Sequence, residues 1–290
     1  MAKPRVIDVD SLTTFTQHVE QLLLTATAQY KGKRFGGNWY RGVGRANTYT
    51  LQPTLYRHPT KKTLEELIIL EAEMMLDFER QGVLHNAASA TAVDQNDLRT
   101  LFYMQHYQVP TRLLDWSTNP FISLYFALSS AAINPKNGRY EEDAAVWVLD
   151  PVAWNSTALS HIRHGDAGPL SHDTAKSSYG PRKLIVGKLE PTALSTLNER
   201  PAAVLGTANN ARMFAQRGVF TIFGRALDSM ETQYQTGKFP EGSLTKLVID
   251  KGKIAEVLAL LLNIGYTDSV SYPDLHGVAM EIKRLNGFRV

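Results

Sequence analysis

A single arginine stands among aromatic residues in the segment Trp39-Tyr40-Arg41-Gly42. Its guanidinium is a planar fork of donors, which suits phosphate oxygens better than the point charge of a lysine does. The segment therefore predicts capture of an anion or a phosphate by Arg41. The alternative is a structural arginine that pairs with a carboxylate, and the sequence leaves both interpretations open.

Polar side chains are dense in a second segment, residues 105–120, which lies between two apolar stretches. Buried polar groups need partners, so these side chains either satisfy one another or point into a cleft. For Asp115, which stands between Leu114 and Trp116, the sequence predicts partial burial with a cationic partner, and Arg112 is the nearest candidate. The polar residues that this segment offers for chemistry are His106, Arg112, Asp115, Ser117, Thr118 and Asn119.

In a third segment, residues 212–220, the pattern predicts the end of a helix, a glycine and then a strand. Glycine is common after helix ends for structural reasons alone, so this pattern does not by itself indicate a functional site. Its Gln216, like Arg41 and His106, lies at the end of an apolar element beside a residue that bends the chain. Rigid scaffolds present functional groups at such positions. We therefore predict that these three residues belong to one site, although they lie far apart in the sequence.

The sequence predicts no metal site and no thiol chemistry. Cysteine is absent, which excludes disulfides, iron–sulfur clusters and thiol nucleophiles. His161 and His164 have the spacing of zinc ligands within a loop, yet only Asp166, His172 and Asp173 lie near enough in the sequence to complete a shell. A solvated loop is the simpler interpretation.

Composition places the chain among ordinary globular proteins. It has 290 residues, of which 43% are hydrophobic and 20% are charged, and its net charge is +3. This balance gives no global electrostatic case for a nucleic-acid or membrane partner. The first ten residues carry charges where a secretory signal needs an apolar run, and no apolar stretch approaches the roughly 18 residues of a membrane span. We expect a cytoplasmic protein without a membrane partner.

The pattern of apolar residues predicts one α+β domain over residues 1–290, with an N-terminal helix at 11–30 and a core from 35 to 290. Helices come first and most strands come later, which favours helices packed around a mixed, mainly antiparallel sheet over a doubly wound parallel sheet. Residues 155–182 are predicted to form a mobile surface loop. Further helices are predicted at 63–81, 94–107, 121–132, 253–263 and 274–285, and strands at 38–43, 144–149, 183–189, 219–224 and 244–249.

Taken together, these segments resemble the FRG domain, a bacterial and phage-associated family named for a Phe/Tyr-Arg-Gly signature. The signature here is Tyr40-Arg41-Gly42. Gln105 to Ala127 matches the family's most telling motif, a Gln-His-x-x-x-Pro-Thr-Arg-Leu-Leu-Asp-Trp run that leads into an apolar helix. Further matches are residues 51–57, 212–220 and 271–277, so the resemblance spans about residues 10 to 285.

The resemblance implies action on a nucleotide. FRG proteins occur in phage-defence and toxin-like contexts and are distantly similar to ADP-ribosyltransferases, which bind NAD. Carried over residue by residue, Arg41 takes the role of the residue on the first core strand, and Ser117 or Thr118 that of a later hydroxyl. Gln216 takes the third role, where such transferases usually have a glutamate, and a neutral glutamine supplies no charge. Asp115 is the candidate to supply that charge instead.

Three functions stay open from the sequence. The first is an NAD-dependent ADP-ribosyltransferase or NAD glycohydrolase in an antiviral defence or toxin role, with NAD as the substrate and a macromolecular acceptor in the transferase case. The second is a non-catalytic module that senses a nucleotide or a phage-derived ligand, and the third is an interaction protein whose polar segment is structural. For the enzyme, the predicted catalytic residues are Arg41, His106, Asp115 and Gln216, with His106 as proton carrier, and the predicted nucleotide-binding residues are Tyr40, Arg41, Gly42, Arg112, Ser117, Thr118 and Asn119.

Overall fold

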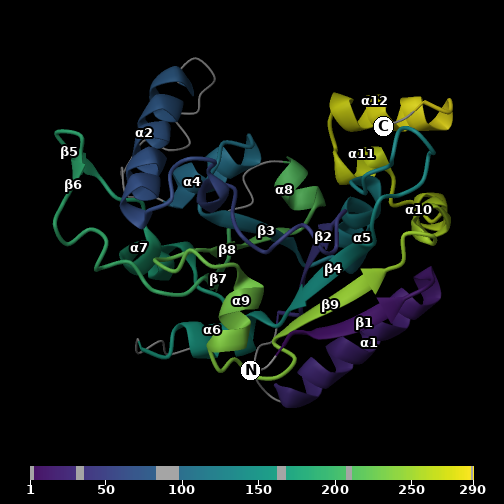
Figure 1. The fold of residues 1–290 in the computed structure, drawn as a ribbon, viewed down its shortest axis with the longest axis horizontal. Coiled ribbons are helices and arrows are strands. Elements are labelled where there is room, and N and C mark those ends of the chain that lie inside the picture. Colours follow the sequence, from purple (N-terminus) through teal and green to yellow (C-terminus); the bar gives the residue numbers. More distant parts are fainter. Residues whose placement is uncertain (1–2, 31–35, 83–97, 162–167, 207–210, 289) are drawn as a thin grey trace.

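A seven-stranded mixed sheet forms the centre of the fold (Figure 1). The computed structural model describes residues 3–30, 36–82, 98–161, 168–206, 211–288 and 290. The strands are β1 (Arg5–Val9), β2 (Trp39–Val43), β3 (Leu113–Ser117), β4 (Ala144–Leu149), β7 (Ala202–Val204), β8 (Gly218–Ile222) and β9 (Leu244–Ile249), with β5 (Leu184–Ile185) and β6 (Lys188–Leu189) in a separate hairpin. Their order in the large sheet is β1-β9-β4-β2-β3-β8-β7, and all of its described pairings are antiparallel except that of β1 with β9. The prediction of an α+β fold around a mixed, mainly antiparallel sheet is confirmed.

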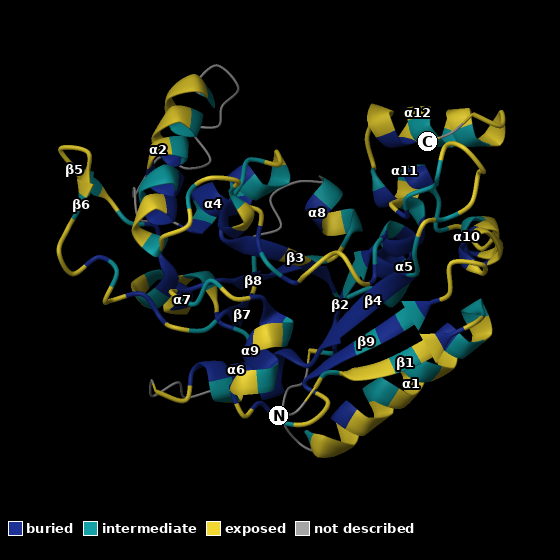
Figure 2. Cartoon of the chain, viewed as in Figure 1, coloured by how far each residue is buried: buried dark blue, intermediate teal, exposed yellow. Residues whose placement is uncertain are grey.

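Helices cover both faces of this sheet. They are α1 (Leu12–Gln29), η1 (Leu55–Arg57), α2 (Leu64–Gly82), α4 (Leu98–His106), α5 (Pro120–Ser129), α6 (Pro151–Ala158), α7 (His172–Tyr179), α8 (Ala211–Ala215), α9 (Met230–Thr236), α10 (Ile254–Asn263), α11 (Asp268–Ser271) and α12 (Leu275–Leu285). One apolar cluster joins α1, α5 and α10 to the sheet, and a larger cluster does the same for α2, α4 and α7. The strands at the centre of the sheet are buried, whereas the outer faces of the helices are exposed (Figure 2). Among the described helices, none has both the length and the apolar character that a membrane crossing requires.

The local sequence explains where two helices begin. In α5, the Asn119 side chain is the N-cap and accepts from the backbone N–H groups of Phe121 and Ile122, at 2.9 and 3.3 Å, while Pro120 occupies the first turn. In α1, Ser11 caps the first turn in a capping box. The predicted N-terminal helix is therefore confirmed as α1.

Some strands differ from the sequence prediction. The sequence predicts no strand at β1, β3 or β7, and β3 lies inside segment 105–120, which we predicted to connect two helices. These strands are only three to five residues long, too short for a clear alternation of apolar and polar residues. The predicted single strand at 183–189 is a hairpin, because the chain turns at Val186 and Gly187, which have φ angles of 50° and 74°.

The predicted surface loop at 155–182 is also corrected. Helix α6 continues into this segment and α7 lies within it. Ser171 caps α7, and Ala175 and Tyr179 are buried on one side of the helix. These two are its only apolar residues, so the sequence shows too little periodicity to predict it. Residues 162–167 of this segment lie outside the described part of the chain.

Candidate functional site

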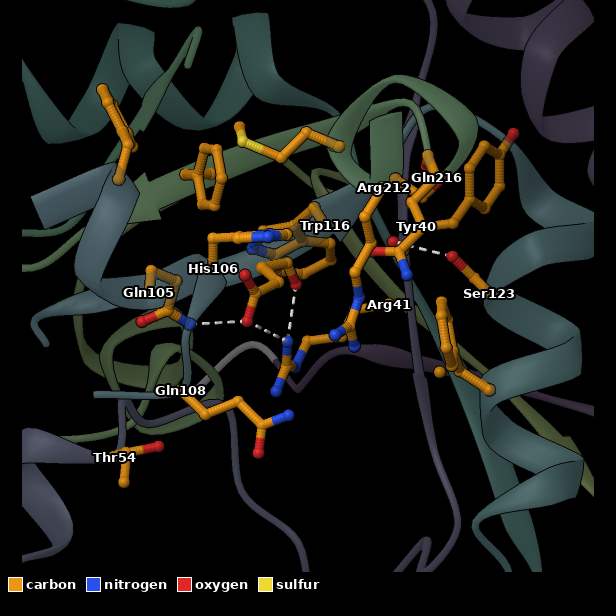
Figure 3. A pocket seen from close by; sticks show the side chains of 18 of the residues that line it. Tyr40, Arg41, Thr54, Gln105, His106, Gln108, Trp116, Ser123, Arg212 and Gln216 are labelled. Carbon is orange, nitrogen blue, oxygen red and sulfur yellow. Dashed lines mark hydrogen bonds and ion pairs between the residues drawn. The ribbon is translucent and has the colours of Figure 1, made fainter. Parts of the chain in front are cut away.

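The sheet opens between β2 and β3. Strand β2 pairs with β4 along its whole length, but with β3 only at Tyr40 and Ser117. Residues of both unpaired stretches line a cavity of about 550 Å³, which α4, α5 and α8 border (Figure 3). The four predicted catalytic residues, Arg41, His106, Asp115 and Gln216, all line this cavity, together with Tyr40, Gly42 and Ser117 from the predicted binding set. The structure thus brings the predicted shared site together, while the role of each residue stays a prediction.

Close packing of β2 on α5 forms one wall of the cavity. A Cβ atom added to Gly42 would lie 1.9 Å from the carbonyl oxygen of Ser123 and 2.6 Å from the backbone nitrogen of Ala127. The Ser123 hydroxyl also donates to the carbonyl oxygen of Tyr40 at 2.9 Å. The glycine of the Tyr-Arg-Gly segment therefore permits contact between two backbones, and that contact fixes the position of Arg41.

Arg41 and Asp115 face each other across the opening of the sheet. Nη1 of Arg41 donates to the carbonyl oxygen of Asp115 at 2.6 Å and lies 3.8 Å from its carboxylate. Burial lowers the pKa of Arg41 and the Asp115 charge opposes this shift, but an arginine stays protonated in either case. The Asp115 side chain is 55% exposed, so the prediction of partial burial beside Arg112 is wrong. Its carboxylate is open to the cavity and has Arg41 as its cationic neighbour.

A short chain of hydrogen bonds holds the Asp115 carboxylate in place. The Thr111 hydroxyl donates to Oε1 of Gln105 at 2.6 Å, and Nε2 of Gln105 donates to Oδ2 of Asp115 at 2.7 Å. Because Thr111 fixes the amide of Gln105, the glutamine presents its N–H to the carboxylate. We did not single out Gln105 from the sequence, although it begins the polar segment, because its role depends on this contact.

His106 shares the cavity with a second arginine, Arg212, which the sequence did not single out as a site residue. The Arg212 guanidinium carbon lies 4.6 Å from the centre of the Tyr272 ring, so it stacks on that ring at the edge of the cavity. Burial and the positive charge of Arg212 lower the pKa of His106, and Asp274 acts in the opposite direction. His106 is therefore neutral near pH 7 and can accept a proton.

We expect NMR titration of the His106 ring to give a pKa below about 6.5, the ordinary value for histidine. Arg212→Gln should raise this pKa toward the ordinary value, because it removes a positive charge that disfavours protonation. The pKa of His106 is lower in the folded chain than in the unfolded chain. At a pH between these two values the unfolded chain binds the proton and the folded chain does not, so acidification through this range should reduce the free energy of unfolding. Arg80→Gln, on the distant helix α2, is the control and should leave the His106 titration unchanged; an equal shift in both variants would contradict the prediction.

Ser117 and Gln216 are fixed by bonds within the cavity wall. The Ser117 hydroxyl donates to the carbonyl oxygen of Gln216 at 2.6 Å and accepts from the backbone N–H of Asn119 at 2.9 Å. Nε2 of Gln216 donates to the carbonyl oxygen of Ser271 at 2.9 Å. Thr118 and Asn119 do not belong to the described cavity lining, and Asn119 serves as the cap of α5. The structure therefore does not bring these two predicted binding residues into the cavity.

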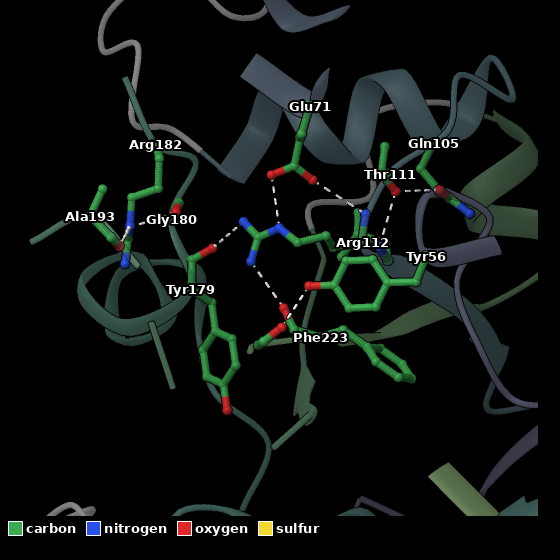
Figure 4. A network of polar contacts seen from close by, with 12 residues as sticks. Tyr56, Glu71, Gln105, Thr111, Arg112, Tyr179, Gly180, Arg182, Ala193 and Phe223 are labelled. Atoms are coloured by element: carbon green, nitrogen blue, oxygen red, sulfur yellow. Dashed lines mark hydrogen bonds and ion pairs between the residues drawn. The ribbon is translucent and has the colours of Figure 1, made fainter. Parts of the chain in front are cut away.

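Arg112 is a structural residue, which corrects its predicted role in holding phosphate (Figure 4). Its side chain is fully buried, with Nε donating to Glu71 at 2.8 Å and its terminal nitrogens donating to the carbonyl oxygens of Phe223 and Tyr179, both at 2.9 Å. Arg112 lies at a bend just before β3, whereas Asp115 lies in the middle of that strand and lines the cavity. Arg112 therefore reaches the core and not the cavity.

The two histidines at metal-like spacing lie only partly within the described residues. Nε2 of His161 lies 2.9 Å from Oδ1 of Asn198, and His164 and Asp166 are outside the described residues. In the described ranges no group of three histidine, aspartate or glutamate side chains is arranged to hold a metal ion.

A known protein family matches part of the chain. The model of the FRG domain matches residues 37–136. This range contains β2, α4, β3 and α5, and with them Arg41, His106 and Asp115, but not Arg212 or Gln216. No curated protein and no solved structure matches the chain.

Proposed function

We propose, from the premise that residues 37–136 of this chain are an FRG domain, that the cavity binds a nucleotide and cleaves the N-glycosidic bond of NAD. The observation that carries the proposal is the charge arrangement around one cavity. Arg41 and Arg212 line it, and Asp115 is the single carboxylate among its described lining residues. Two arginine side chains can bind the negative charges of a diphosphate. One carboxylate held in place can stabilise a positive charge that forms on the sugar between the phosphate and the base.

Size and lining support the binding step. A cavity of about 550 Å³ lies within the range of about 300–1,000 Å³ that is common for small-molecule sites. Arg41 and Arg212 hold the phosphates, and the rings of Trp116 and Phe126 offer apolar contact for a base or a ribose. Nε of Arg41 is buried and has no hydrogen-bond partner in the described part of the chain. Burying an unpaired donor costs free energy, and a functional role for Arg41 explains why the protein accepts this cost.

The chemical step breaks the bond between ribose C1′ and the nicotinamide nitrogen. Nicotinamide leaves with the bonding electron pair as a neutral molecule, and positive charge develops on C1′, which the Asp115 carboxylate stabilises. Water, or a nucleophile on an acceptor, then bonds to C1′ and releases a proton. Neutral His106 accepts that proton, for which its lowered pKa is suited. The resemblance to FRG proteins suggests that this reaction serves phage defence or a toxin.

The decisive experiment is incubation of the purified protein with NAD, followed by chromatography of the released nicotinamide. Asp115→Asn should lower the rate by about 10- to 100-fold, because the amide cannot stabilise the charge on C1′. Stability should change little, since the carboxylate is more than half exposed. Asp77→Asn, an exposed aspartate paired with Arg80 on α2, is the matched control and should keep full activity. Binding of NAD without release of nicotinamide would refute the enzyme and favour the sensing module.

Binding of NAD or ADP-ribose should depend on the shape of the Arg41 side chain as well as its charge. We expect Arg41→Lys to weaken affinity nearly as much as Arg41→Ala, by about 10- to 100-fold, because lysine cannot form two parallel bonds to a phosphate. Calorimetric titration measures this, with Arg80→Lys on α2 as the control that should bind normally. An Arg41→Lys variant with the affinity of the unsubstituted protein would contradict the proposed role.

A further inference from the structure

The turn between α11 and α12, residues 271–274, lies against the part of the cavity wall that α8 forms. Helix α11 packs against both α8 and α12 (Figure 1). The fully buried carboxylate of Asp268, at the start of α11, accepts from the Tyr125 hydroxyl of α5 at 2.5 Å and from Arg284 of α12 at 2.8 and 2.9 Å. Burial strengthens these bonds, so they fix the turn in place relative to α5 and α8.

Tyr272, the first residue after α11, contacts two side chains that line the cavity. The guanidinium carbon of Arg212 lies 4.6 Å from the centre of the Tyr272 ring. The rings of Tyr272 and Phe126 pack edge to face, with their centroids 5.6 Å apart. Arg212 and Phe126 belong to the described lining, whereas Tyr272 does not. A guanidinium that stacks on a ring directs the N–H groups at its rim away from that ring, so they can bind an anion.

Two other residues of the turn act on the cavity lining. The carbonyl oxygen of Ser271 accepts from Nε2 of Gln216 at 2.9 Å. Asp274 raises the pKa of His106 by its negative charge, against the effects of burial and of Arg212. Arg212 and Asp274 are therefore the charges that act on His106 in the described part of the chain. One of them belongs to this turn and the other stacks on it.

We propose that Tyr272 is a positioning residue, whose ring holds the Arg212 guanidinium at the cavity, where it binds one phosphate of a diphosphate. This inference rests on the proposed nucleotide binding and adds to it a residue outside the cavity lining. Arg212 is only half-buried, so its long side chain turns into solvent when the ring is absent. Nucleotide binding must then order that side chain again, which lowers the affinity.

Affinity for ADP-ribose, measured by calorimetric titration, tests this role. Tyr272→Leu removes the ring but keeps an apolar side chain, and it should weaken binding by roughly tenfold, since the stack on Arg212 is lost. Tyr272→Phe keeps the ring, so it is the matched control and should bind within about twofold of the unsubstituted protein. In a chain that already carries Arg212→Gln, Tyr272→Leu should weaken binding no further, because the ring acts through the arginine. An equal loss with and without Arg212→Gln, or an equal loss in Tyr272→Phe, would overturn the proposal.

Titration of the His106 ring by NMR tests the same role without a nucleotide. Tyr272→Leu should raise the pKa of His106, because the Arg212 charge that lowers this pKa moves away. Tyr272→Phe should leave the pKa unchanged, since the arginine keeps its ring. In a chain that already carries Arg212→Gln, Tyr272→Leu should also leave the pKa unchanged, which separates the loss of the arginine's position from a loss of packing.

The two measurements distinguish failure of this role from failure of the proposed function. A His106 pKa that Tyr272→Leu leaves unchanged overturns the positioning role, even if the protein binds ADP-ribose. A raised pKa in a protein that binds no ADP-ribose supports the positioning of Arg212 but refutes the nucleotide as its ligand. Circular dichroism shows whether Tyr272→Leu stays folded, and Tyr272→Met, which fills more of the space, replaces it in both measurements if it does not.

Discussion

Glu71→Gln should lower the free energy of unfolding by about 3–5 kcal/mol, because it leaves the Arg112 charge buried without its counter-ion. Glu71 is 1% exposed and Arg112 is not exposed at all. Two carbonyl oxygens still accept from the guanidinium in the variant, from Phe223 and Tyr179. Neither carries a full negative charge, so they compensate only part of the lost attraction.

Urea denaturation followed by tryptophan fluorescence measures this loss. The matched control is Glu199→Gln, which removes the carboxylate of an ion pair with Arg225. The N–O distance of that pair is also 2.8 Å, but its side chains are exposed, Glu199 by 55% and Arg225 by 41%. The exposed pair should contribute at most about 1 kcal/mol. If the two substitutions cost the same, Arg112 does not have the structural role that its burial indicates.

The sequence predicts best those elements whose signal is local. Strand β4 occupies the predicted residues 144–149, and α5 begins within one residue of the predicted start at 121, because a run of buried apolar residues needs no information from elsewhere in the chain. Strand β3 is not predictable in this way. It has exposed Asp115 at its middle, and its full-length partner β8 lies about a hundred residues later.

The same distinction between local signals and long-range contacts applies to the residues of the candidate site. Arg41, His106, Asp115 and Gln216 are found from the sequence, because they stand in unusual polar segments or at element ends. Arg212 is missed, since its place beside His106 depends on how α8 packs. The prediction fails at Arg112 because its partners, Glu71, Phe223 and Tyr179, are distant in the sequence and meet it only in the fold. Residue type and spacing thus predict residues that the structure places around one cavity, while the pairings between them need the fold.

Gly42→Ala should reduce the free energy of unfolding by about 3 kcal/mol, at the upper end of the usual cost of overpacking. The added methyl carbon would lie 1.9 Å from the carbonyl oxygen of Ser123, which is closer than any contact between such atoms. Ser123 belongs to helix α5, whose residues are mostly buried, so the helix backbone cannot give way as a flexible side chain would. Strand β2 and α5 must therefore move apart.

This separation should also damage the cavity, because Gly42 is next to Arg41 and both residues line it. We expect Gly42→Ala to weaken binding of ADP-ribose even at temperatures at which the variant is folded. Gly218→Ala is the matched control, since Gly218 also lines the cavity but an added methyl carbon there would be 3.7 Å from the nearest atom, an ordinary contact. Thermal denaturation and calorimetric titration of both variants give the comparison. If Gly42→Ala is as stable as Gly218→Ala, the close approach of β2 to α5 is not the reason why position 42 requires glycine. If Gly42→Ala binds ADP-ribose normally, the position of Arg41 does not depend on that contact.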